Sequence, residues 1–169
     1  MLKILLPVDS SDISRYAVKH VIHRVWTGEA LDIHLIHVQP RAGWFPLPFV
    51  ARSAREARRA ERSREVLDAA AQLLDRAGLR YSAHSCRGDP AQEIVRYAHA
   101  NQFGGIVLAS AGLGSVFEML LGSVTATVLR TSRVPVEVVP ASPRSWIRAF
   151  GVPAGLGAGL LALVLLALD

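Results

Sequence analysis

Two glycines separated by nine residues, the second followed by a serine, form the pattern in this sequence that is best suited to holding a phosphate. Gly112 and Gly122 let the backbone approach an anion closely, and Ser123 adds a hydroxyl donor. A helix that begins here would present amide N–H groups and a partial positive charge to that anion. The alternative is that the glycines only let the chain turn tightly, and this choice decides whether the protein binds a nucleotide.

The common phosphate-binding motifs do not fit this stretch. A Walker loop needs Gly-Lys followed by Ser or Thr, which the sequence does not contain. Residues 112–117 supply two glycines of a dinucleotide-binding fingerprint, but Phe117 occupies the place of the third. That fingerprint also belongs after the first strand, whereas this loop follows the fourth predicted strand.

Residues that could catalyse a reaction are few. The histidines have no cysteine or carboxylate at metal-ligand spacing, and we interpret His20 and His23, three apart on a predicted helix, as surface or core residues. Ser110 and Ser115 have no base nearby in the sequence. The single cysteine, Cys86, excludes an internal disulfide, and we favour a small core residue over a catalytic thiol. These observations favour a binding module over an efficient enzyme.

The elements that must position these residues alternate along the first 140 residues. Short apolar runs predict five strands, at residues 3–8, 31–38, 79–86, 104–110 and 134–140. Helical patterns lie between them, including one over residues 52–77 that ends at Gly78 and one with Asp89 as N-cap and Pro90 at its first position. We also expect Asp9 to Ser11 to cap the helix that follows the first strand.

Repeated strand–helix units indicate an α/β fold with a five-stranded, parallel, doubly wound sheet of the Rossmann-like type. Ligands of such sheets bind at the carboxyl ends of the strands, where the strand order reverses. Asp9, Val38 and the loop that begins at Ala109 all fall at such ends. We therefore expect a pocket there.

Four stretches, taken together, resemble the universal stress protein family. They are residues 5–21, 36–40, 88–98 and 111–139, in the family's order and with compatible spacing. The resemblance covers nearly all of Lys3 to Val139. It implies a sheet of the adenine nucleotide alpha hydrolase-like type.

The nucleotide-binding branch of that family has Gly, two residues, Gly, nine residues, then Gly followed by Ser or Thr. Gly112, Gly122 and Ser123 match this motif in the present sequence. Ala109 replaces the first glycine, and Ala111 replaces a histidine that usually precedes the second. Alanine at 109 adds only a methyl group, so it weakens binding only if the backbone there needs a positive φ.

The resemblance implies an adenine nucleotide as ligand, with ATP favoured and with or without Mg²⁺. Asp9 and the backbone of Pro7 and Val38 would surround the adenosine, and the glycine loop would hold the phosphates. The expected nucleotide-binding residues are Pro7, Asp9, Val38, Ala109, Gly112, Gly122, Ser123 and Val124. The protein would act as a stress-linked sensor or regulator, with at most slow ATP hydrolysis. The alternative is a nucleotide-free dimeric scaffold of the same fold.

The excess of positive charge does not by itself indicate a nucleic-acid partner. The formal net charge is +5, and the arginines concentrate between Arg52 and Arg64. Glutamates are interspersed there and aromatic residues are lacking, so we interpret this stretch as a solvated helix face and expect no nucleic acid. Alternatively, the positive charge would attract the protein to an anionic membrane surface.

The C-terminal segment is apolar throughout. Residues 149–168 contain no charged side chain, and a helix of this length spans about 30 Å, the thickness of a bilayer core. We therefore predict a universal stress protein domain over 1–142, a basic juxtamembrane linker over 143–148 and a transmembrane tail anchor over 149–169. Arg144, Trp146 and Arg148 place the domain on the cytoplasmic side of the inner membrane.

Two contacts between copies are expected. Gly151, Gly155 and Gly159 follow the small-xxx-small pattern that lets membrane helices approach closely. The family resemblance implies a homodimer through the last strand, at about residues 134–139, which would bring two tails side by side. The expected partners are thus a second copy, membrane lipid and a membrane protein.

Overall fold

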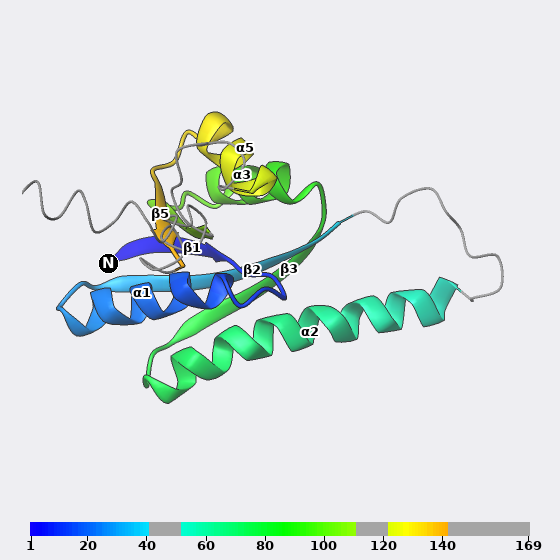
Figure 1. Cartoon of the computed structure of the whole chain (residues 1–169), viewed down its shortest axis with the longest axis horizontal. Helices are drawn as coiled ribbons and strands as arrows, with labels where there is room; N and C mark the ends of the chain where they lie inside the picture. The colour runs from blue at the N-terminus through cyan, green and yellow to red at the C-terminus, as the bar shows by residue number, and fades with distance from the viewer. Residues whose placement is uncertain (41–51, 111–121, 142–169) are drawn as a thin grey trace, which may run out of the picture.

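The computed structural model of the chain describes residues 1–40, 52–110 and 122–141. Strands and helices alternate along these residues, as Figure 1 shows. The elements are β1 (Leu2–Pro7), α1 (Ser14–Trp26), β2 (Leu31–Pro40), α2 (Arg52–Arg76), β3 (Tyr81–Gly88), α3 (Pro90–Ala100), β4 (Gly105–Ser110), α5 (Ser123–Thr131) and β5 (Val136–Pro140).

The five strands form one parallel sheet, which confirms the predicted fold class. Their order is β3-β2-β1-β4-β5, and every neighbouring pair is parallel. The chain adds strands outward from β1 to β3, and it then crosses back to place β4 on the other side of β1. The strand order therefore reverses between β1 and β4, and ligands of such sheets bind beside that reversal.

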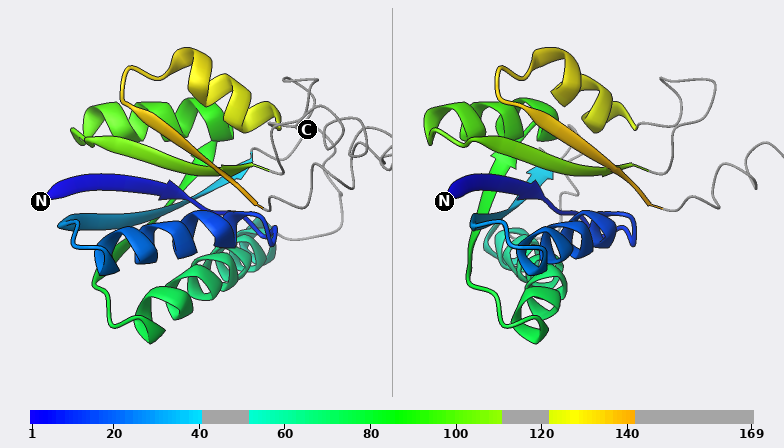
Figure 2. Two further views of the ribbon diagram at one scale, coloured as in Figure 1. Left: turned by 60° about the vertical axis from the view of Figure 1, so that its left-hand side comes forward. Right: turned by 90° about the vertical axis from the view of Figure 1, so that its left-hand side faces the viewer.

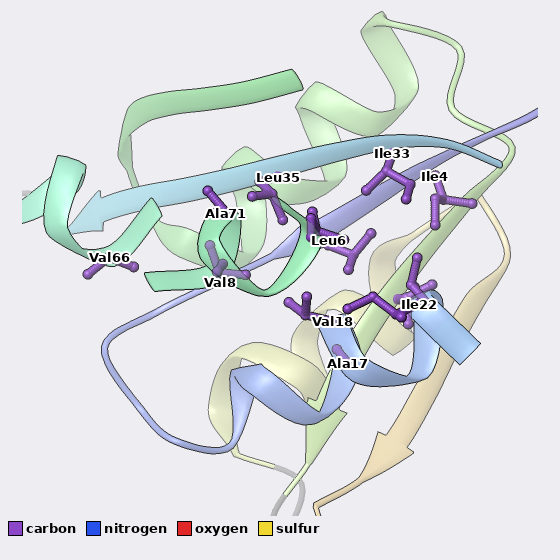
Figure 3. Packing of buried hydrophobic residues seen from close by; sticks show 14 residues of the cluster. Ile4, Leu6, Val8, Ala17, Val18, Ile22, Ile33, Leu35, Val66 and Ala71 are labelled. Atoms are coloured by element: carbon purple, nitrogen blue, oxygen red, sulfur yellow. The ribbon is translucent and has the colours of Figure 1, made fainter. Parts of the chain in front are cut away.

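Helices cover both faces of the sheet. α1 and α2 pack on one face, and α3 and α5 pack on the other (Figure 2). Successive residues of β1 point to opposite faces, so Leu6 belongs to the core beneath α1 and α2 while Leu5 belongs to the core beneath α3 and α5. Figure 3 shows the first of these cores, where Leu6 and Val18 lie together. Burial on both faces explains the apolar run from Ile4 to Leu6 in β1.

Two predicted helix ends are confirmed. Asp89 caps α3, because its Oδ1 accepts a hydrogen bond from the Gln92 amide at 3.0 Å and Pro90 follows at the first helical position. Beyond the C-terminus of α2, Gly78 has a φ of +70°, and the Leu79 amide donates to the Leu74 carbonyl at 3.0 Å. A positive φ of this kind is the usual reason for glycine after a helix.

The start of α1 differs from the prediction. The helix begins at Ser14, and its N-cap, Ile13, makes no side-chain capping bond. Asp9 does not cap the helix because its Oδ1 accepts from the Ser11 amide at 3.0 Å and from the Ser11 hydroxyl at 2.5 Å. These bonds form a tight turn between β1 and α1.

The expected location in the inner membrane is corrected by the structure. Within residues 1–40, 52–110 and 122–141, none of the helices combines the length and the apolar character that a bilayer crossing requires. α2 is long enough at 25 residues, but arginines and glutamates recur along it, and charged side chains are costly in a bilayer core. The predicted linker (143–148) and tail anchor (149–169) lie outside the described residues, so the transmembrane part of the predicted fold has no support.

Candidate functional site

A cavity of about 930 Å³ opens at the carboxyl ends of β1, β2 and β4. This is the edge of the sheet beside the point where the strand order reverses. Parts of α2, α3 and α5 complete its walls, so the cavity reaches both faces of the sheet. Its position is the one at which doubly wound sheets bind ligands.

The end of β1 supplies one wall. Val8 is buried, and its amide donates to the Ile36 carbonyl at 2.9 Å, which extends the pairing of β1 with β2 by one residue. Asp9 follows and is exposed at the cavity, where its bonds to Ser11 hold the carboxylate in place. Ser14 donates from its hydroxyl to the Asp9 carbonyl at 3.2 Å. The turn therefore fixes an acceptor side chain at the mouth of the cavity.

The end of β2 supplies the second wall. Val38 is buried, with 8% of its surface exposed, and lines the cavity. The neighbouring His37 bonds through Nδ1 to the Val8 carbonyl at 2.9 Å. Because a carbonyl oxygen only accepts, Nδ1 bears the proton in this bond. The bond ties the ends of β1 and β2 together beneath the cavity.

The third wall combines the end of β4 with the start of α5. Ser110 is buried, and its carbonyl accepts from the Ala141 amide at 2.7 Å, which joins the ends of β4 and β5. Gly122 is the N-cap of α5, with φ 72° and ψ 145°, and as a glycine it makes no side-chain capping bond. The amides of Ser123 and Val124 lie in the first helical turn, where helix geometry provides no carbonyl partner. The first turn also has no acidic residue that would repel an anion.

Ala109 fits its position without strain. It lies in β4, opposite Val139 of β5 in the ladder. Among the residues that the structure describes, Gln102 is the only non-glycine with a positive φ. Alanine in place of the family's first glycine therefore meets no backbone penalty here, which removes the reason for expecting it to weaken binding.

Seven of the eight residues expected from the sequence line this one cavity. Gly112 lies outside the described residues. The seven residues come from β1 or its end, β2, β4 and α5. They are Pro7, Asp9, Val38, Ala109, Gly122, Ser123 and Val124. Their contacts with a nucleotide stay predictions.

Among the lining residues that were not predicted from the sequence are two cations, Arg59 and Arg62 of α2. The sequence prediction placed all arginines between Arg52 and Arg64 on a solvated helix face. The available signal was the spacing of Arg59 and Arg62 with Val66, since positions three and seven apart share one side of a helix. Val66 is buried in the core, so that side of α2 faces the sheet.

Of the other candidate side chains, His20 has a structural partner and Cys86 is partly buried, while Ser115 lies outside the described residues. His20 bonds through Nε2 to Glu137 at 2.6 Å, which links α1 to β5. Burial, followed by the Glu93 carboxylate, raises the pKa of the Cys86 thiol. A raised pKa lowers the thiolate fraction, which agrees with a core residue rather than a nucleophile. Within the described ranges, no three His, Cys, Asp or Glu side chains are grouped to hold a metal ion.

Comparison with known proteins decides the family. The family model described as the universal stress protein family matches residues 1–140. The chain belongs to the universal stress protein family. Universal stress protein MJ0531 of Methanocaldococcus jannaschii is 30% identical over 139 residues, covering 81% of each chain. Universal stress protein YxiE of Bacillus subtilis is 26% identical over 147 residues, covering 81% of this chain and 97% of its own.

Solved structures of universal stress proteins have the same fold. The hypothetical protein MJ0577 superposes with a TM-score of 0.65 at 30% identity, over 82% of this chain and 95% of its own. A universal stress protein from Arabidopsis thaliana, solved with AMP bound, gives a TM-score of 0.64 at 18% identity, over 85% of this chain and 94% of its own. One from Archaeoglobus fulgidus was solved with dAMP, and a further family member with cAMP. At identities of 18% to 23% these three show the fold alone.

Proposed function

We propose that the cavity at the carboxyl edge of the sheet binds an adenine nucleotide, and that the protein is a stress-linked sensor or regulator that responds to this ligand. The observation that supports this most is the convergence of seven expected contact residues on one cavity. They come from distant parts of the chain, between Pro7 and Val124, so their meeting is a property of the fold. Relatives solved with AMP, dAMP and cAMP have this fold.

The start of α5 suits the phosphate. The amides of Ser123 and Val124 point along the helix axis toward the N-terminus, where the helix dipole favours negative charge. Ser123 is exposed at the cavity and adds a hydroxyl donor. Hydrogen bonds to a charged group contribute about 1.5–3 kcal/mol each. Two such bonds would account for a large share of a micromolar affinity, which corresponds to about 8 kcal/mol.

The ends of β1 and β2 suit the nucleoside. Buried apolar side chains that line the cavity, among them Ile36, Val38 and Leu108, provide a surface for the purine. The Asp9 carboxylate accepts hydrogen bonds and so fits the hydroxyls of the ribose or the amino group of adenine. The volume of about 930 Å³ lies within the range of about 300–1,000 Å³ that small-molecule pockets occupy.

The preferred nucleotide is part of the proposal. We favour ATP, while AMP, dAMP and cAMP are the ligands of the solved relatives. All four share an adenine base, a pentose and at least one phosphate, which is the chemistry that the cavity walls match. Asp9 is the one carboxylate among the described lining residues, so a Mg²⁺ ion would arrive with the phosphates rather than occupy a site of its own.

Calorimetric titration tests the proposal against the nucleotide-free scaffold. The full-length protein is titrated with ATP, AMP, cAMP and adenosine, with and without Mg²⁺. We expect saturable binding of the phosphorylated ligands and weaker binding of adenosine, because adenosine makes no contact with α5. Absence of binding by every nucleotide, with a folded circular dichroism spectrum, would support the scaffold instead.

We also propose that two copies associate through β5. This strand lies at the edge of the sheet and pairs with β4 alone in the described ladder. Its outer edge therefore presents backbone groups that a second strand can satisfy. A dimer formed in this way leaves the cavity open, because the cavity lining includes no residue of β5.

A further inference from the structure

Two arginines of α2 face the cavity without a carboxylate partner among the residues that the structure describes. Arg59 and Arg62 both line the cavity, and in the described part of the chain neither forms an ion pair. Arg15, Arg24 and Arg96, by contrast, each bond a carboxylate. Two guanidinium groups beside a partly apolar cavity are therefore placed to meet an anion from outside the protein.

Contacts between α2 and the sheet hold these arginines at the cavity. The Gln39 side chain donates from Nε2 to the Arg59 carbonyl at 2.7 Å, which joins the end of β2 to α2. One residue after Arg62, the buried Ser63 bonds through its hydroxyl to the Ser85 hydroxyl of β3 at 2.9 Å. These two bonds fix the rotation of the helix, so its arginine pair is presented to the cavity by the fold itself.

The arginine pair and the start of α5 lie on opposite faces of the sheet. Figure 2 shows α2 on one face and α5 on the other. Residues of both helices line the cavity, so the two arginines reach it from the face opposite the proposed phosphate site at α5. Among the described lining residues, Asp9 is the sole carboxylate against two arginines, and both arginines lie on the wall opposite the proposed 5′-phosphate site at α5.

We propose that the cavity recognises an adenine nucleotide with a second phosphate on its ribose, and that Arg59 and Arg62 bind this second phosphate. This inference rests on the proposed function, because it takes the 5′-phosphate to lie at α5. The 2′ and 3′ hydroxyls form the edge of the ribose remote from the 5′ position. A phosphate on that edge would face away from α5 and toward α2, where the planar guanidinium groups match its oxygens.

The test compares mononucleotide and bisphosphates on the full-length protein. Calorimetry at fixed ionic strength measures the Kd of AMP, adenosine 3′,5′-bisphosphate and adenosine 2′,5′-bisphosphate. The test variant is Arg59→Gln/Arg62→Gln. The matched control is Arg58→Gln/Arg64→Gln, which removes the same charge from exposed positions of the same helix that do not line the cavity.

We expect at least one bisphosphate to bind the wild type tenfold or more tightly than AMP does. Arg59→Gln/Arg62→Gln should abolish this preference and keep the Kd of AMP within about twofold, while the control retains the preference. The inference is overturned if the wild type binds AMP and both bisphosphates equally. It is also overturned if the test variant weakens AMP and bisphosphates by the same factor, since the arginines would then contact the nucleoside.

The outcomes separate this inference from the proposed function. AMP binding without a bisphosphate preference retains the function and rejects the role of the arginines. Bisphosphate binding that depends on the arginines, without AMP binding, retains the inference and rejects AMP as a ligand. A folded protein that binds none of the three rejects both.

Discussion

Replacing Gly122 with alanine should weaken nucleotide binding, and it should lower stability only by the backbone strain that remains after the chain relaxes. Gly122 has φ 72° and ψ 145°, a backbone conformation that only glycine adopts readily. A Cβ at this position would have no neighbour within 4 Å among the described residues, so the cost of alanine in this part of the chain is backbone strain rather than a clash. Strain of this kind costs about 1–3 kcal/mol when the surrounding structure holds the backbone in place.

The exposed position of Gly122 gives the chain a way to relax. Alanine would move the N-cap toward a negative φ and turn the amides of Ser123 and Val124 away from the phosphate. Loss of one charge-assisted hydrogen bond costs about 1.5–3 kcal/mol, which raises Kd by about 10- to 150-fold. The thermal midpoint should fall by about 2–4 °C for each kcal/mol of strain that remains.

Gly78→Ala is the matched control. Gly78 has a φ of +70° and, like Gly122, has open space around its Cβ position. It follows α2 and does not line the cavity. We expect Gly78→Ala to lower the thermal midpoint and leave the Kd of AMP unchanged, as measured by differential scanning calorimetry and isothermal titration. If Gly122→Ala binds AMP as tightly as Gly78→Ala does, the start of α5 does not hold the phosphate.

Three further predictions concern pH, position 109 and assembly. Burial, followed by nearby His34 and Lys3, lowers the pKa of His84 from its usual 6.5. The unfolded chain then binds the proton more readily, so the free energy of unfolding, measured with urea, should fall as pH drops below about 6.5. His84→Gln should make this dependence on pH weaker. An equal dependence on pH in both proteins would refute the role of His84. Ala109→Gly should lower the free energy of unfolding by up to about 1 kcal/mol, because glycine is unfavourable inside a strand. It should change the Kd of AMP less than threefold, because position 109 needs no positive φ. A tenfold gain in affinity for AMP would contradict this. Sedimentation equilibrium should find a dimer at micromolar concentration, whereas a monomer at 100 times that concentration would exclude pairing through β5.

The strands and the start of α3 were predictable because their signals are local. The buried residues of β1, Ile4 to Leu6, are all apolar since both faces of the sheet are covered, and Asp89-Pro90 forms a capping pattern within adjacent residues. The cavity could also be placed in advance, because the carboxyl ends of parallel strands meet at one edge. The start of α1 was missed because the Asp9 side chain had two competing partners, a helix amide and Ser11, and the sequence alone does not rank them.

The place of Arg59 and Arg62 at the cavity depends on long-range contacts of α2, which no local sequence pattern reveals. Arg59 and Arg62 differ from Arg58 and Arg64 only in which side of α2 they occupy. That side is set by the bonds of α2 to β2 and β3, between residues 20 or more positions apart. The membrane location was inferred from the length and apolar character of one segment and from its basic and aromatic flank, and the described helices did not bear it out.

The most direct test of the central claim is an amide chemical-shift titration of the full-length protein with AMP. We predict large shifts for Ser123 and Val124 at the start of α5 together with Val38 at the end of β2, and adenosine should shift Val38 while leaving α5 unchanged. Shifts confined to other surfaces, or no shifts at millimolar AMP, would contradict nucleotide binding in this cavity.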